Sequence, residues 1–128
     1  MDSTLDLKLK DFKKAFESLN NIVKTGFETD DILRDAAIQR FEYTYELFWK
    51  TYKLYLEETF GTLANSPKEV FRALLKHNIL TADETHLALN MVSDRNSSTH
   101  AYNETFAVTL ALKIPDYIKL FEHLSKQK

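Results

Sequence analysis

An uninterrupted stretch from Ile32 to Phe60 constrains the fold of this chain more than any other feature. It contains neither glycine nor proline, so we expect a single helix of about 30 residues, roughly 45 Å long. Apolar or aromatic side chains occupy nearly every face of its middle part, Phe41 to Leu56. A helix that is apolar all round is buried on several sides. We therefore expect the other helices, together with a second copy in a homodimer, to cover it.

The remaining segments are also expected to be helical, because the whole chain has only two glycines and two prolines. Sandwiches and barrels of β-strands use many of both in their turns. An N-terminal helix is predicted from an apolar stripe with spacings of four and three residues: Leu5, Leu9, Phe12, Phe16, Leu19 and Val23. Ser66-Pro67 and Thr81 are typical helix starts, and Pro115 is expected to kink or restart the last helix. The predicted fold is all-α: one domain, residues 1–128, forming an antiparallel, up-and-down bundle of five to six helices.

Composition and charge narrow the classes of function. The chain has no cysteine, which excludes disulfides and thiolate metal sites and makes the cytoplasm the expected compartment. Neither a signal peptide nor a membrane span is expected, because the sequence has no long unbroken apolar run. The net charge of −2 gives no support to duplex-DNA binding, although it leaves room for a small local basic site.

The polar stretch Asp94–Glu104 gathers more potential chemistry than any other part of the chain. It holds Arg95, His100 and Tyr102 within eight residues. On a continuous helix, positions five residues apart lie about 140° apart around the axis. Residues 96–99 are weak helix formers, so we expect a helix end or an irregular turn that brings Arg95 and His100 together. A polar junction between two helices, without chemistry, is the alternative interpretation.

An arginine and a neutral histidine are a suitable pair for cleaving RNA. The guanidinium binds a phosphate bidentately and stabilises the charge that develops on it. The imidazole, which ordinarily titrates near pH 6.5, moves a proton to or from a 2′-hydroxyl. Because RNA supplies its own nucleophile, this chemistry needs neither a metal nor a cofactor. The other histidines, His77, His86 and His123, are expected at the surface or at helix ends.

Two blocks of the sequence resemble the HEPN superfamily, in particular its subfamily of nucleotidyltransferase substrate-binding proteins. The first block is Gln39–Lys50 and the second is Arg95–Glu104, and the resemblance covers nearly the whole chain. The second block matches the Arg-x4-6-His motif of the superfamily, extended by the x-Tyr that follows it in HepT-type toxins. The resemblance implies an all-helical homodimer in which motif residues from both subunits line one cleft.

The same resemblance implies a function and a role for each motif residue. Many of these proteins are metal-independent ribonuclease toxins, encoded beside a minimal nucleotidyltransferase that acts as the antitoxin by adenylylating the motif tyrosine. Arg95 would then stabilise the scissile phosphate, His100 would be the general acid or base, and Asn96 would be an auxiliary polar group. Tyr102 would be the modified residue, and an AMP group there would block RNA entry by its bulk and negative charge.

Two other functions remain open at this stage. The dimer can instead present a nucleotide or another substrate to a partner nucleotidyltransferase, without chemistry of its own, or it can be a helical scaffold without a site. Glu42 and Glu46 of the first block also have two interpretations. They form a solvated stripe in which Glu46 pairs with Lys50, or they face a cleft between subunits. No chemical step is assigned to either glutamate.

Overall fold

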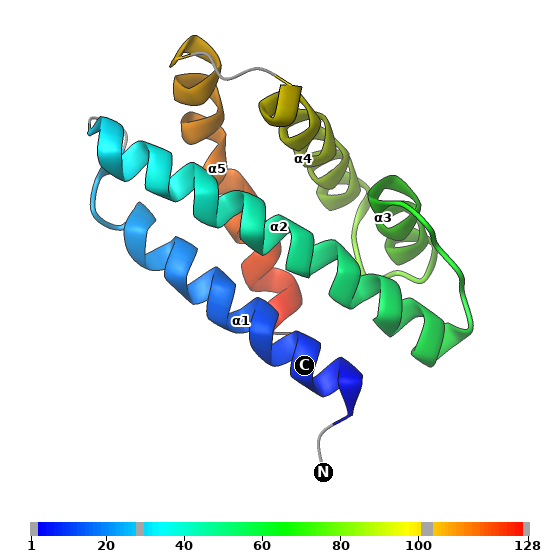
Figure 1. Cartoon of the computed structure of the whole chain (residues 1–128). Coiled ribbons are helices and arrows are strands. Elements are labelled where there is room, and N and C mark those ends of the chain that lie inside the picture. The colour runs from blue at the N-terminus through cyan, green and yellow to red at the C-terminus, as the bar shows by residue number, and fades with distance from the viewer. Residues whose placement is uncertain (1–2, 28–29, 101–103, 127–128) are drawn as a thin grey trace.

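The computed structural model describes residues 3–27, 30–100 and 104–126, and within these residues 97–100 through their backbone alone. All regular structure in the described ranges is helical (Figure 1): α1 (Thr4–Val23), α2 (Asp31–Phe60), α3 (Pro67–Lys76), α4 (Ala82–His100) and α5 (Glu104–Ser125). The predicted all-α bundle is thereby confirmed, with five helices in these ranges. None of them combines the length and the apolar character that crossing a membrane requires.

The sequence around α2 explains where this long helix begins and ends. The carboxylate of Asp30, the N-cap residue, accepts hydrogen bonds from the backbone N–H groups of Ile32 and Leu33. Gly61 ends the helix in the left-handed conformation at φ 67°, which a glycine adopts without steric cost. The helix predicted from Ile32 to Phe60 is therefore confirmed to within one residue.

The helices α1 and α2 pack antiparallel along most of their length (Figure 1). Near the start of α1, the Thr51 hydroxyl donates to the backbone carbonyl of Lys8 at 3.4 Å. Near its end, Nε of Arg40 donates to the Ser18 hydroxyl at 3.0 Å. The residue numbers rise on one helix as they fall on the other, which is the antiparallel arrangement predicted for neighbouring long helices.

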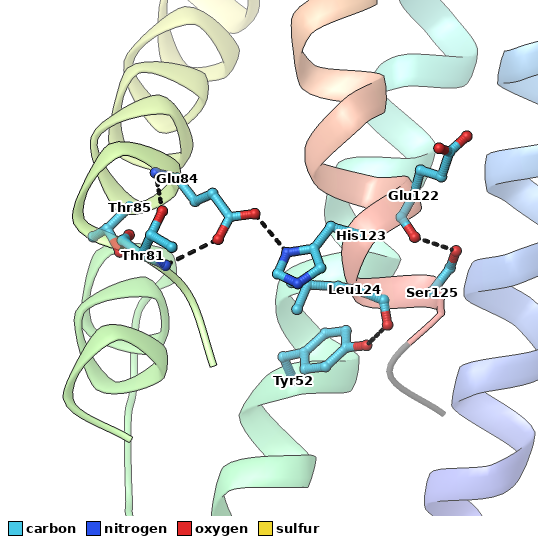
Figure 2. A network of polar contacts seen from close by, with 8 residues as sticks. All are labelled: Tyr52, Thr81, Glu84, Thr85, Glu122, His123, Leu124 and Ser125. Atoms are coloured by element: carbon cyan, nitrogen blue, oxygen red, sulfur yellow. Dashed lines mark hydrogen bonds and ion pairs between the residues drawn. The ribbon is translucent and has the colours of Figure 1, made fainter. Parts of the chain in front are cut away.

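The helices α4 and α5 also run antiparallel, while α5 runs in the same direction as α2. Figure 2 shows His123, close to the end of α5, against Glu84 in the first turn of α4, with 2.5 Å between Nδ1 and Oε2. On the other side, the Tyr52 hydroxyl of α2 donates to the backbone carbonyl of Leu124 at 2.9 Å. The four long helices therefore alternate in direction, and the short α3 lies in the connection between α2 and α4.

The core is built on aromatic rings from several helices. The fully buried ring of Phe121 on α5 lies 6.0 Å from Phe12 of α1 and 4.9 Å from Phe48 of α2, measured between ring centroids. Phe48 in turn stacks on Phe71 of α3 at 5.5 Å. Edge-on and stacked aromatic contacts add to the free energy of burying the rings. One cluster thus fixes α2 against α1, α3 and α5.

The other helices of the same chain cover much of the aromatic middle of α2. Phe41, Tyr45 and Phe48 are buried, and Trp49 is partly exposed. The exception is Tyr43, whose exposed fraction is 61%. As expected, the other helices of this chain do not cover the middle of α2 completely. They leave Tyr43 exposed and several other side chains partly exposed.

The last helix is predicted to kink or to restart at Pro115, and of these two outcomes the restart is wrong. The helix α5 continues from Glu104 to Ser125 with Pro115 inside it. An internal proline removes one backbone hydrogen bond and costs about 3 kcal/mol. On either side of it, Ile114 and Tyr117 are buried in the core. Burial of these side chains offsets the cost, so tertiary packing overrides the local preference.

Candidate functional site

The arginine of the polar stretch lies near the end of α4 and contacts a carboxylate of α2. Nη1 of Arg95 is 3.5 Å from Oε2 of Glu42, and the two side chains are only 20% and 29% exposed. Glu42 belongs to the first sequence block and Arg95 to the second, so the fold brings the two blocks together. The interpretation of Glu42 as one of a solvated stripe is wrong, because it forms a partly buried ion pair between helices.

A buried phenol lies in the same electrostatic environment. Burial raises the pKa of Tyr45 above its ordinary value, the charge of Glu46 raises it further, and the nearby charge of Arg95 lowers it. Tyr45 is therefore a neutral hydroxyl at physiological pH. Glu46 itself pairs with Lys50 at 3.4 Å, as predicted, and accepts a hydrogen bond from Nε1 of Trp49 at 3.3 Å.

A second set of contacts fixes the end of α4 against α5. The Tyr117 hydroxyl donates a short hydrogen bond to Asp94, the residue before Arg95. Nζ of Lys113 lies 3.4 Å from the same carboxylate. Burial raises the pKa of Tyr117 first, and the hydrogen bond and charge of Asp94 raise it further. Arg95 thus sits on a segment of α4 that is held to α2 through Glu42 and to α5 through Asp94.

The predicted break between Arg95 and His100 is not present. The backbone of α4 stays helical through Asn96, which is exposed, as far as His100, its last residue. Asparagine and serine cost only a few tenths of a kcal/mol each within a helix, and each added residue gains a backbone hydrogen bond. The ties of Asp94 and Arg95 to neighbouring helices favour this continuation. The side chain of His100 and all of Tyr102 lie outside the described residues.

The sequence did not indicate that Asp94 and Tyr117 contact each other beside the motif. It also did not indicate that Glu42 pairs with Arg95. One signal for Tyr117 was available, because it is a hydroxyl-bearing residue within the apolar stripe of the last helix. Asp94 carries no local signal, since its partners lie on another helix. His123 was expected at a helix end, where it lies, but its contact with Glu84 was not predicted.

Metal-ligating side chains do not gather in the part of the chain that the structure describes: no three of its histidine, aspartate or glutamate residues are arranged to hold an ion. The groups shown to act on Arg95 include the carboxylate of Glu42 at 3.5 Å, and the charge of Arg95 in turn acts on the Tyr45 hydroxyl. This arrangement can orient a guanidinium and hold it toward an anionic ligand.

The fold and the site define a class of small helical bundles. In this class an arginine lies close to the C-terminal end of a long helix, and a carboxylate of a neighbouring helix fixes its orientation. Within this class, the chain belongs to the family described as nucleotidyltransferase substrate binding protein like, whose sequence model matches residues 7–128. Family membership confirms the resemblance carried by the two sequence blocks.

A solved structure shares the fold. The crystal structure of a protein from Thermus thermophilus superposes with a TM-score of 0.83 and 41% sequence identity, over 91% of this chain and 97% of that chain. No protein among the curated ones matches the chain.

Proposed function

We propose that this chain is a metal-independent endoribonuclease that acts as the toxin of a toxin–antitoxin pair. In this proposal a minimal nucleotidyltransferase is the antitoxin, and it adenylylates Tyr102. The observation that carries the proposal is the contact of 3.5 Å between Glu42 and Arg95, which orients the motif arginine on the same helix that ends at His100. The family description, which refers to nucleotidyltransferases, supports the choice of partner.

The proposed active unit is a homodimer of single-domain chains, residues 1–128, in the cytoplasm. The continuity of α4 supports the dimer, because positions 95 and 100 of an unbroken helix lie about 140° apart around its axis. On one helix these two positions therefore do not face the same site. A cleft lined by motif residues from two copies does not require them to do so.

The proposed reaction is an internal transesterification of RNA. The 2′-oxygen forms a bond to phosphorus while the bond from phosphorus to the 5′-oxygen breaks, which gives a 2′,3′-cyclic phosphate and a 5′-hydroxyl. His100 takes the proton of the 2′-hydroxyl or supplies one to the leaving 5′-oxygen, and water carries out the other of these two proton transfers. Arg95 binds the phosphate and stabilises its added negative charge. Asn96, exposed on the last turns of α4, is an auxiliary donor or acceptor.

Cleavage assays on the purified protein with a panel of RNAs, in the presence of a chelator, test this function. We expect Arg95→Ala and His100→Ala each to reduce the cleavage rate by about a hundredfold or more. The matched controls are Arg72→Ala and His86→Ala, which remove an exposed arginine and an exposed histidine elsewhere on the bundle. A wild type and a His100→Ala variant with equal activity, or with none on any RNA, would contradict the proposal.

The second candidate is a subunit that presents a nucleotide or another substrate to the partner enzyme, and the family description favours it directly. Intact-mass measurement of the protein co-expressed with the neighbouring nucleotidyltransferase separates the two. One or more added AMP groups, lost in Tyr102→Phe, support the toxin. An unmodified protein whose Arg95→Ala variant impairs nucleotidyl transfer to another substrate, with no RNA cleavage, supports the substrate-binding subunit.

A further inference from the structure

Two shallow hollows lie along the seam between α1 and α2, away from the contact of Glu42 with Arg95. The first, of about 310 Å³, is lined by Asp11, Lys14, Ala15, Ser18, Arg40 and Tyr43. The second, of about 250 Å³, is lined by Lys8, Lys50, Lys53, Leu54 and Glu57.

The two hollows belong to one face of the helix pair. The lining residues of α1 recur at spacings of three and four residues, which keeps them on one side of that helix: Lys8, Asp11, Lys14, Ala15 and Ser18. The lining residues of α2 keep the same period: Arg40, Tyr43, Lys50, Lys53, Leu54 and Glu57. Because α1 and α2 lie side by side and antiparallel (Figure 1), both hollows lie along the same seam, and together they are called the seam groove. From Arg40 to Lys53 it extends roughly 20 Å at 1.5 Å per residue.

This seam groove is basic, although the whole chain has a net charge of −2. Its described lining has five basic side chains and two acidic ones. The guanidinium of Arg40 uses Nε for Ser18 and Nη1 for the carbonyl of Ala36, and a guanidinium has five N–H donors in total. The ring of Tyr43, 61% exposed, forms part of the same lining. Basic side chains beside an exposed aromatic ring are the features by which proteins hold single-stranded nucleic acid.

We propose that the seam groove binds the backbone of single-stranded RNA, with Lys14 and Arg40 at phosphates and Tyr43 stacked on an unpaired base. This inference rests on the proposed function, because RNA is then the substrate. Tyr43 directly follows Glu42, whose carboxylate contacts Arg95. Successive residues of a helix project about 100° apart, so the groove lies on a different side of α2 from the helix that carries the motif. The groove therefore contributes substrate affinity rather than chemistry. A single strand fits better than a duplex, since stacking on Tyr43 needs an exposed base face.

Fluorescence anisotropy with a labelled oligouridylate tests the groove, with every variant made in a His100→Ala background so that RNA is not cleaved. We expect Lys14→Gln/Arg40→Gln to weaken binding roughly tenfold, because two phosphate contacts are lost. The slope of log affinity against log salt should become shallower by about 1.4, at about 0.7 for each phosphate contact on a single strand. The matched control is Lys68→Gln/Arg72→Gln on α3, which removes one exposed lysine and one exposed arginine and should leave affinity and slope unchanged.

The aromatic contact has its own pair of variants. Tyr43→Ala should weaken binding roughly tenfold through loss of stacking, and Tyr43→Phe should bind like the parent because the ring remains. Thermal melting followed by circular dichroism establishes that each variant is folded, as expected for changes to exposed side chains. Equal loss in both Tyr43 variants would overturn the stacking contact.

The outcomes separate this inference from the proposed function. If the wild type cleaves RNA but the groove variants keep the parent affinity, salt slope and KM, the groove inference is overturned and the ribonuclease proposal remains. If no RNA is cleaved while binding still depends on Lys14, Arg40 and Tyr43, the groove inference is supported and the ribonuclease proposal fails. If the groove variants lose binding to the partner nucleotidyltransferase and keep RNA binding, the groove is a protein interface and the inference is overturned.

Discussion

At the scale of single residues, the orientation of Arg95 is the feature on which the proposed chemistry depends. Its guanidinium has a carboxylate partner on another helix, Glu42, at 3.5 Å. The preceding residue, Asp94, is bound by the Tyr117 hydroxyl and by Lys113. An arginine held in this way loses less conformational freedom when it binds a phosphate, and reactive geometry tolerates little misplacement.

We predict that Glu42→Gln lowers kcat/KM for RNA cleavage by about tenfold to a hundredfold, because Arg95 loses the charge that orients it. Stability should change by less than about 1 kcal/mol, as is usual for a partly exposed ion pair. Steady-state cleavage and urea denaturation measure the two effects. The control is Glu58→Gln, which changes an exposed glutamate near the end of the same helix and should leave cleavage unaffected. Equal effects of the two changes would show that Glu42 has no special role.

The partners of Arg95 could not be predicted from the sequence. The contact of Glu42 with Arg95 depends on how α2 and α4 lie in the bundle, which no local pattern encodes. Local patterns did identify Arg95, His100 and Tyr102 as candidates, because three chemically useful side chains within eight residues stand out in any helical chain.

At the scale of helices, local chemistry specified most boundaries and failed where packing overrides it. The long α2 follows from the absence of glycine and proline and from the caps at Asp30 and Gly61. The continuation of α4 past Asn96 was not predicted, and for α5 the sequence left both a kink and a restart open at Pro115. In both cases one or a few residues disfavour a helix, and contacts with other helices outweigh that local preference. The energies of those contacts cannot be read from a single segment.

The start of α4 provides a test at this scale, because that helix carries the motif at its other end. Thr81 and Glu84 form reciprocal hydrogen bonds with each other's backbone N–H (Figure 2), and Glu84 also contacts His123 of α5. We predict that Thr81→Ala lowers the free energy of unfolding by about 1 kcal/mol. Glu84→Ala should lower it further, since two contacts are lost. Urea denaturation measures both, with the exposed Glu122→Ala as the control.

A Glu84→Ala variant no less stable than the Glu122→Ala control would contradict this account of the start of α4. It would mean that the contact between Glu84 and His123 contributes nothing beyond an ordinary exposed pair.

At the scale of the whole molecule, the bundle buries tyrosines on α2 and α5, and its stability should be sensitive to alkali. Burial raises the pKa of Tyr45, Tyr52 and Tyr117 above the ordinary value of 10.0. These phenols stay neutral in the folded protein, whereas the unfolded chain releases their protons above pH 10. Their contribution to stability is therefore complete below pH 10 and is lost as the pH rises beyond it.

We predict that the free energy of unfolding falls above pH 10 by about 1.4 kcal/mol per pH unit for each of these tyrosines. Urea denaturation between about pH 9 and about pH 11.5, with tyrosinate absorbance recorded in parallel, measures the loss. Tyr117→Phe should show a less steep decline than the wild type, because one of the three groups is removed. A wild type whose stability does not change across this range would show that the phenols titrate alike when folded and unfolded.

The central claim concerns the product of the reaction, and mass spectrometry of the cleaved RNA tests it most directly. The wild-type protein, in the presence of a chelator, should release fragments that end in a 2′,3′-cyclic phosphate, and a 2′-deoxy substitution at the cleaved nucleotide should prevent the cut. Arg95→Ala and His100→Ala should form little or none of this product. Fragments without a cyclic phosphate, or cleavage that persists at the 2′-deoxy position, would contradict the proposal that Arg95 and His100 act on the 2′-hydroxyl of RNA.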